Sequence, residues 1–423
     1  MNLAPHPRCG PAGRRAVTIV GAVGLLALVL SAVDGSDPVA GHPVPRGPAA
    51  PWNGSASAAA AVGADSMTAR AAGLRLLTAA ATAARVSSYQ GVQVISWRIP
   101  DGSGSWLGSG TGQAAVDVWH QSGLGTLTRM ASAGPASAWS QLTDDPDDQL
   151  PDGVLGLTPR LLGLLARHYA VFYAGLGSAD GRPARIVEVM RPNGTAAAMF
   201  WLDSATNLPL RRELFDSGAD MISEDAFASL KLGRPAGVPV PASAGTPASA
   251  GTPASAGTGA GTPADAPSPA VVLQPWTDEL SAARLATLRA SGWPVPGFGS
   301  AGLTLFEASE AATAAGQVID LSYSDGLSAV SVFVQRGRLP AFFPGWRETT
   351  LRGHALYVRD PADPAQPSLT WSADGFVYTV LADAPGTLIA QVVNALPHDT
   401  RPGFWRRIGH GVRRLLSWAN PFR

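Results

Sequence analysis

The segment from residue 234 to residue 274 most constrains how this 423-residue chain can fold. It contains PASAGT three times in tandem, from Pro241 to Thr258. Proline recurs and large apolar side chains are missing from the repeats, so they cannot bury enough apolar surface to form a core. We therefore expect a linker between two globular regions, residues 67–233 and 275–398.

The overall composition supports folded domains on both sides of this linker. Hydrophobic residues make up 46% of the chain and charged residues 15%, which is enough apolar material for real cores. The 31 basic and 31 acidic residues give a formal net charge of zero, so no whole-chain field favours nucleic acid as a partner. The single cysteine, Cys9, excludes an intramolecular disulfide and a cysteine-based zinc site.

Residues 1–36 have the pattern of a signal or membrane-anchor segment. Two arginines precede the uncharged apolar run Ala16–Val33, and two aspartates follow it. Its length lies between a signal-peptide core and a minimal spanning helix, and the flanking charges place the rest of the chain outside the cytoplasm. Because the cleavage site around residues 31–35 is poor, we expect an uncleaved anchor on the extracytoplasmic side of the membrane. Export after signal cleavage is the alternative. Residues 37–66 are expected to be a spacer.

The first globular region, residues 67–233, predicts an opening helix followed by an antiparallel meander. Apolar residues recur at helical spacing from Met67 to Ala81. A short helix is expected at Pro159–His168. Asn193-Gly194 lies between two apolar runs, which is a strong hairpin signal.

The second region, residues 275–398, predicts a capped helix that stops before Pro294, then strands, then a closing helix at Gly386–Leu396. Asp-Gly pairs at Asp325 and Asp374 separate apolar runs and indicate tight hairpins. The expected strands are Ala301–Ala308, Gln317–Ser324, Leu327–Gln335, His354–Arg359, Ser368–Ala373 and Phe376–Leu381. The fold class expected for both regions is α+β, with antiparallel sheets and terminal helices.

The strand that follows the first Asp-Gly pair contains the run AVSVFV. This run suggests burial on both faces, and hence a central strand in the core of a docking domain. The alternative is that this hairpin forms a partner surface directly. The candidate partner-binding residues are Tyr323, Asp325, Leu327 and Phe333.

Residues 399–423 form a basic tail in which apolar residues fall on one helical face and arginines on the rest. Such a helix is typical of membrane-surface or partner docking, and packing on the second domain is the alternative. The candidate membrane-interface residues are Phe404, Trp405, Arg406, Arg407, Ile408, Arg413, Arg414, Leu415 and Trp418.

Motifs for catalysis are missing from the sequence. The seven histidines lack metal-ligand spacing, and there is no GxSxG, Walker A, HExxH or dinucleotide fingerprint. We expect the glycine-rich stretch Gly102–Gly112 to be a hairpin loop, because no helix opens after it to cradle a phosphate. The acidic stretch Asp144–Asp152 lacks EF-hand spacing and is expected to be a solvated loop. The sequence therefore predicts a binding protein with no catalytic residue, cofactor or metal.

Three segments together resemble the MucB/RseB family of sigma-E regulators. They are SSYQGVQVISW, then GRPARIVEVMRPNG with MFWLDSATNLPLRRELFD, and finally YSDGLSAVSVFV. They occur in the family's order and cover both globular regions, about two-thirds of the chain. The pairing of the WLD-containing segment with the later YSDGL segment is the specific part of the resemblance.

The resemblance implies that residues 67–233 form a half-open antiparallel sheet around helices, similar to the lipoprotein carrier LolA, with an apolar cavity. It implies a smaller α+β domain in residues 275–398. It also implies that the protein binds the extracytoplasmic part of a membrane anti-sigma factor and shields it from proteolysis until a lipidic or misfolded-envelope signal arrives. The alternative is a lipid or lipoprotein carrier. The chain departs from the family in its anchor, its repetitive linker and its basic tail.

Overall fold

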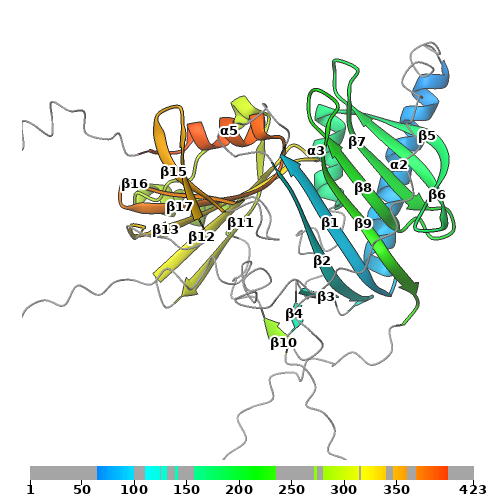
Figure 1. Ribbon diagram of the computed structural model, residues 1–423, viewed down its shortest axis with the longest axis horizontal. Helices are drawn as coiled ribbons and strands as arrows, with labels where there is room; N and C mark the ends of the chain where they lie inside the picture. Colours follow the sequence, from blue (N-terminus) through cyan, green and yellow to red (C-terminus); the bar gives the residue numbers. More distant parts are fainter. Residues whose placement is uncertain are drawn as a thin grey trace, which may run out of the picture.

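Two mainly antiparallel sheets with helices packed against them form two domains (Figure 1). The computed structural model describes residues 64–99, 110–123, 125–130, 139–141, 157–234, 271–273, 280–313, 316–339, 346–359 and 368–398. The predicted anchor at residues 16–33, the PASAGT repeats, the acidic stretch Asp144–Asp152 and the basic tail lie outside these residues. Among the helices within them, none combines the length and apolar character needed to cross a membrane.

The first domain is a ten-stranded sheet that is not closed into a barrel. Its order is β10-β4-β3-β2-β1-β9-β8-β7-β6-β5, so the last long strand pairs back with the first. The strands are β1 (Tyr89–Ile99), β2 (Gly110–Gln121), β3 (Gly125–Met130), β4 (Trp139–Gln141), β5 (Ala170–Ala179), β6 (Arg182–Met190), β7 (Ala196–Asp203), β8 (Pro209–Phe215), β9 (Met221–Leu232) and β10 (Val271–Leu273). The half-open antiparallel sheet expected for this region is confirmed.

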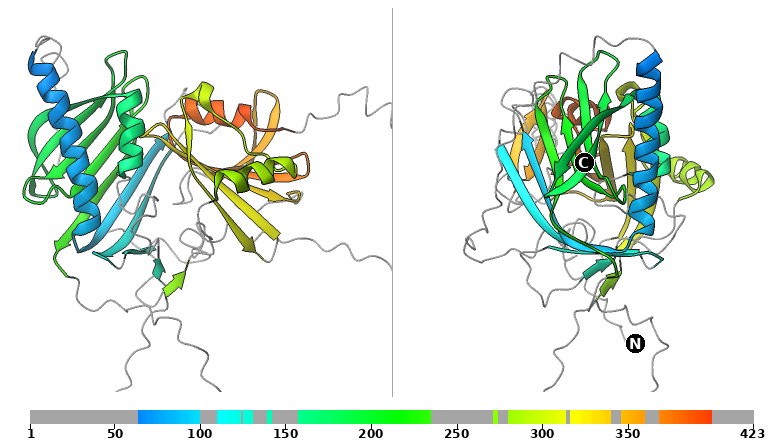
Figure 2. Two further views of the ribbon diagram at one scale, coloured as in Figure 1. Left: turned by 180° about the vertical axis from the view of Figure 1, so that it is seen from behind. Right: turned by 90° about the vertical axis from the view of Figure 1, so that its right-hand side faces the viewer.

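Helix α2 (Ala64–Val86) opens the first domain and lies across the sheet (Figure 2). Its buried residues include Leu77, Ala80 and Ala81, which pack in one core with Val187 and Phe200 of the sheet. The many alanines of this helix allow a close approach to the strands. At Gly73 a Cβ atom would lie only 2.8 Å from the backbone carbonyl carbon of Phe172 on β5.

The second domain is a seven-stranded sheet in the order β11-β12-β13-β17-β16-β15-β14. Its strands are β11 (Thr304–Thr313), β12 (Gly316–Ser324), β13 (Ala329–Arg336), β14 (Trp346–Leu351), β15 (His354–Arg359), β16 (Ser368–Ala373) and β17 (Phe376–Asp383). Helices α4 (Ala282–Ala290) and α5 (Gly386–Ala395) and the 3-10 turn η4 (Gly299–Ala301) complete the domain. Leucines of α4 and the apolar residues Ile389, Val392 and Val393 of α5 pack in the main core of this sheet.

Strand β13 is buried on both faces, as the run AVSVFV predicts. Val330, Val332 and Val334 face the core that the helices cover. Phe333 packs with Val318 on the opposite face of the sheet. This burial on both faces agrees with the position of the strand inside the sheet, between β12 and β17.

Several strands differ from the sequence-based expectation, and β4, β5 and β9 were not predicted. β14 (WRETTL) was not predicted, because an edge strand with several exposed polar residues shows little apolar alternation. β10 lies inside the segment predicted as linker, where VVL pairs in parallel with β4 of the first domain. The predicted hairpin at Asn193-Gly194 is confirmed between β6 and β7, with Gly194 at a φ of +82°.

We expect Leu77→Ala to lower the free energy of unfolding by about 2–5 kcal/mol, because its fully buried side chain leaves a cavity under α2. Met67→Ala on the same helix is the matched control. Met67 is 75% exposed, so its loss should change the free energy by no more than about 0.5 kcal/mol. Urea unfolding of the full chain, followed by circular dichroism, measures both, and equal effects would contradict the assigned packing of α2.

Candidate functional site at the contact between the two domains

Helix α3 (Pro159–His168) lies between the two domains. It begins at the N-cap Thr158, whose hydroxyl accepts a hydrogen bond from Leu161 N at 3.2 Å, and Pro159 follows in the first turn. Leu162 and Leu165 pack in the core of the first domain, together with α2. Leu161 and Leu164 pack on Phe306 of the second domain. A helix that is apolar on two faces needs a neighbour on each, and here the two neighbours are the two domains.

A β-bulge in β11 presents Phe306 to this helix. Leu305 is opposite Tyr323 and Glu307 is opposite Ser322, so Phe306 is the extra residue on its strand. A bulge turns a side chain out of the regular alternation. Phe306 is 5% exposed, although it does not join the main core of its own domain.

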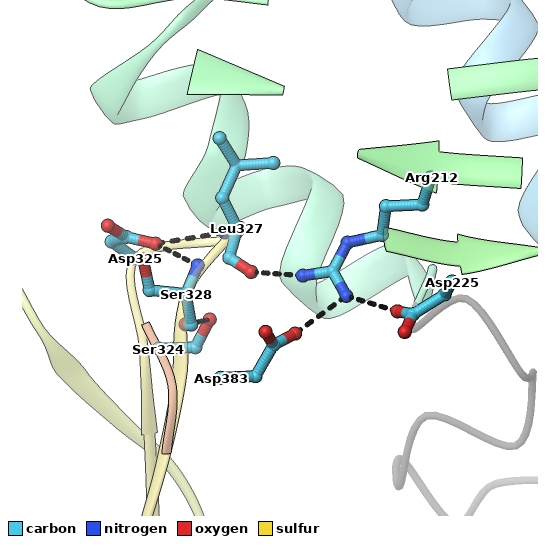
Figure 3. A network of polar contacts seen from close by, with 7 residues as sticks. All are labelled: Arg212, Asp225, Ser324, Asp325, Leu327, Ser328 and Asp383. Atoms are coloured by element: carbon cyan, nitrogen blue, oxygen red, sulfur yellow. Dashed lines mark hydrogen bonds and ion pairs between the residues drawn. The ribbon is translucent and has the colours of Figure 1, made fainter. Parts of the chain in front are cut away.

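The tip of the β12–β13 hairpin is held in shape by its own polar side chains (Figure 3). The Asp325 carboxylate accepts hydrogen bonds from Leu327 N at 2.9 Å and Ser328 N at 2.7 Å. The Ser324 hydroxyl accepts one from Gly326 N at 2.9 Å and donates one to Ser328 O at 2.8 Å. The tip therefore keeps one conformation by its own local hydrogen bonds.

This tip inserts into the first domain. Leu327 is 6% exposed and belongs to the core of the first domain, with Leu165 and Phe200. Gly326 has a φ of +97°, and a Cβ atom on it would lie 2.1 Å from Leu165 N of α3. Glycine is therefore required at this position for two reasons, its backbone conformation and the close approach to the helix.

Arg212 on β8 joins the two domains through polar contacts beside Leu327 (Figure 3). Its Nη1 donates to Asp225 Oδ2 of β9 at 3.0 Å and to Asp383 Oδ2 at the end of β17 at 2.8 Å. Its Nη2 donates to the backbone oxygen of Leu327 at 2.7 Å. The side chains of Arg212 and Asp225 are about nine-tenths buried. Their hydrogen bonds to these partners therefore replace the contacts with water that burial removes.

The pKa values of this cluster follow from burial and from the charges. Burial by itself lowers the pKa of Arg212, but Asp383 and Asp225 outweigh it and hold that pKa above its ordinary value. Burial raises the pKa of Asp225 to about 7; Arg212 opposes the rise, and the nearby Asp383 carboxylate adds to it. Arg212 thus stays charged, and Asp225 becomes the group that titrates near neutral pH.

Tyr169, just after α3, contacts the other side of the tip. Its hydroxyl donates to Asp325 Oδ2 at 2.6 Å. Burial raises the pKa of Tyr169 far above its ordinary value, and the charge of Asp325 raises it further. The two oxygens of Asp325 therefore have separate roles, one inside the turn and one between the domains.

The aspartate of the WLD segment is structural. Asp203 accepts hydrogen bonds from Arg182 Nε at 2.9 Å and from the backbone and hydroxyl of Thr206 at 3.0 and 2.7 Å. Burial acts to raise its pKa, but these hydrogen bonds outweigh burial and lower it. Asp203 thus holds the turn that leads into β8.

The predicted partner-binding residues are all buried within the chain, and the structure separates them into two groups. Asp325 and Leu327 meet the first domain, as described above. The Tyr323 hydroxyl donates to Pro296 O at 2.7 Å inside the second domain, and Phe333 lies on the opposite face of that sheet. The nine candidate membrane-interface residues of the tail lie outside the described residues.

Sequence reasoning missed Arg212, Asp225, Asp383, Tyr169 and Phe306. A signal existed for Arg212, because it precedes the buried Leu214 by two residues in a strand and so shares its covered face. A charged residue at such a position needs a buried partner. No comparable pattern identifies Phe306, since its orientation depends on the bulge.

The arrangement can hold the two domains together, and its polar groups bond to one another. Within the described ranges, no group of three or more His, Cys, Asp or Glu residues could hold a metal ion.

No family model matches the sequence, and none of the curated proteins matches it. Among solved structures, MucB in complex with MucA(peri) is 19% identical, with a TM-score of 0.37, covering 78% of this chain and 100% of that one. The MucA/MucB complex of Pseudomonas aeruginosa is 20% identical, with a TM-score of 0.36 and the same coverage. A LolA superfamily protein from Nitrosomonas europaea is 10% identical, with a TM-score of 0.17, covering 38% of this chain and 93% of that one. Likeness at these TM-scores does not by itself assign a function to this chain.

We expect Gly326→Ala to separate the two domains, because its Cβ atom would collide with the backbone of α3. Gly375→Ala is the matched control. Gly375 also follows an aspartate in a hairpin turn and has a φ of +81°, but a Cβ atom added there would have nothing within 4 Å. Both substitutions cost about 1–2 kcal/mol in backbone strain, and only the first affects docking.

Small-angle X-ray scattering of the full chain measures this difference. The radius of gyration should rise for Gly326→Ala and stay at the wild-type value for Gly375→Ala. Equal radii for the two variants would contradict the docking of the tip against α3.

Proposed function

We propose that this protein is an extracytoplasmic, membrane-tethered regulator of sigma-factor activity that binds the extracytoplasmic part of an anti-sigma factor and protects it from proteolysis. One observation carries the proposal. The two segments that make up the specific part of the MucB/RseB resemblance contact each other, through the hydrogen bond from Arg212 to the backbone oxygen of Leu327. The segments that carry the resemblance thus include residues that join the two domains.

The chemistry of this contact suits a binding protein. Arg212, Asp225 and Asp325 have hydrogen-bond partners within the protein, and leucines on two faces of α3 pack against the two domains. A regulator that acts by covering a segment of another protein requires a stable relation between its two domains and no reactive side chain. We therefore propose that the protein is not an enzyme.

Tethering would strengthen the interaction with a membrane-bound partner. If residues 16–33 anchor the chain, both proteins share one membrane, and their effective concentration rises without any new contact. The spacer at residues 37–66 would then give the domains reach above the membrane.

A lipid or lipoprotein carrier is the second candidate. It is favoured by the apolar cluster under the half-open sheet, which includes Tyr89, Trp97, Val116, Val118 and Phe227. The docked tip argues against it, because Leu327 already fills part of the covered face of the first domain.

The test is capture of the full chain from membranes of its own host after crosslinking in the cell. We expect recovery of a single-pass membrane protein whose cytoplasmic part binds a sigma factor. Its purified extracytoplasmic segment should bind the full chain saturably in calorimetry. The same segment should be cleaved several-fold more slowly by a protease when the chain is present.

Gly375→Ala should bind this segment as the wild type does, which controls for backbone strain at a hairpin. Recovery of acyl lipids alone, extracted from the purified chain and identified by mass spectrometry, would support the carrier and refute the regulator. Binding without any slowing of cleavage would refute the protective role but would still support the anti-sigma factor as the partner.

The role of the anchor is tested separately by deleting residues 1–36 and directing the remainder to the same compartment with a cleavable signal. At equal protein level we expect weaker repression of the sigma factor, with an unchanged melting temperature. Full repression by the released form would show that tethering is not needed.

A further inference from the structure

Two carboxylates from different domains bind the same nitrogen of one buried arginine. Asp225 Oδ2 and Asp383 Oδ2 both accept from Nη1 of Arg212, at 3.0 and 2.8 Å (Figure 3). Asp225 and Arg212 are neighbours within the first domain. Asp383 arrives only when the second domain docks.

This geometry contains one positive charge and two negative charges. Arg212 can neutralise one carboxylate, and the other remains as an excess negative charge in a site with little access to water. Two carboxylates that share a site cannot both ionise freely, and a proton on one of them relieves the repulsion. The site therefore favours a proton when the domains are docked.

Few other charged groups face this site. Glu224 precedes Asp225 on β9 and forms an ion pair with Arg211 at 3.1 Å, and its charge also acts on Asp225. From the hairpin tip, Asp325 is engaged by Tyr169 on the far side of Leu327. No second cation contacts Asp225 or Asp383 among the ion pairs of the described residues.

We propose that docking of the second domain on the first takes up one proton, held by the Asp225–Asp383 pair, so that the contact between the domains tightens as the pH falls. The pair is a proton-linked latch on the hairpin tip.

The sign follows from the two states of Asp225. In the undocked first domain it lies beside Arg212 without Asp383, so the neighbouring negative charge that raises its pKa in the docked state is missing. In the docked state burial raises its pKa to about 7, with Asp383 adding to the rise. A carboxyl whose pKa is higher in the docked state stabilises that state at low pH, and this stabilisation is lost as the pH rises to about 7.

Hydrogen–deuterium exchange of the full chain tests the latch, because docking adds burial to the local hydrogen bonds of the Leu327 and Ser328 amides, and both residues are 6% exposed in the docked chain. Their protection factors, corrected for the intrinsic exchange rates, are measured at pH 5, 6, 7 and 8. For the wild type we expect protection to fall by up to about tenfold per pH unit between pH 5 and pH 7 and then to level off.

Asp225→Asn keeps an oxygen that can accept from Arg212 but cannot ionise. We expect its protection to stay high and nearly independent of pH. The matched control is Asp117→Asn, which breaks the ion pair with Arg129 at 2.6 Å between β2 and β3 of the first domain. This control should keep the wild-type pH dependence.

A wild-type protection factor that does not change with pH would overturn the proposal, as would equal pH dependence in wild type and Asp225→Asn. If Asp225→Asn does not fold, Asp383→Asn replaces it. That variant leaves Arg212 with one carboxylate, so Asp225 stays ionised to lower pH and the decrease between pH 5 and pH 7 should become several-fold smaller. An unchanged decrease in Asp383→Asn would equally refute the latch.

Discussion

The insertion of the β12–β13 hairpin tip into the first domain is the interaction on which the two-domain structure depends. Leu327 completes an apolar core that belongs to the other domain, and Gly326 lets the tip approach the backbone of α3. Without this insertion, the outer leucines of α3 and Phe306 would be exposed to water. The tip thus turns two separate sheets into one unit.

Apolar and polar contacts at the tip contribute differently to docking. Burial of Leu327 and Phe306 supplies most of the attraction, since it removes apolar surface from water. The hydrogen bonds of Arg212 and Tyr169 add direction, because they are satisfied only when the tip lies in one position. The buried charges therefore contribute specificity, and the unequal charge count makes that specificity sensitive to protons.

The sequence predicted the helices and strands better than the contacts between them. Periodicity located α3, α5 and strands β15 and β16 at or within one residue of their observed bounds, because each depends on local spacing and turn residues. It missed β14, whose polar edge position weakens the alternation, and it placed β10 in the linker. Of the four predicted partner residues, Asp325 and Leu327 lie at the domain contact, whereas Tyr323 and Phe333 lie inside the second domain.

The sequence alone predicts two α+β domains on either side of a repetitive linker, and an Asp-Gly turn that precedes a strand buried on both faces. These features follow from hydrophobic period and turn chemistry, which act over a few residues. The docking of this turn in the other domain, and the contact of Asp383 with Arg212 across 171 positions of chain, follow from the tertiary fold. Such contacts depend on how two folded surfaces fit together, and no local pattern in the chain encodes that fit.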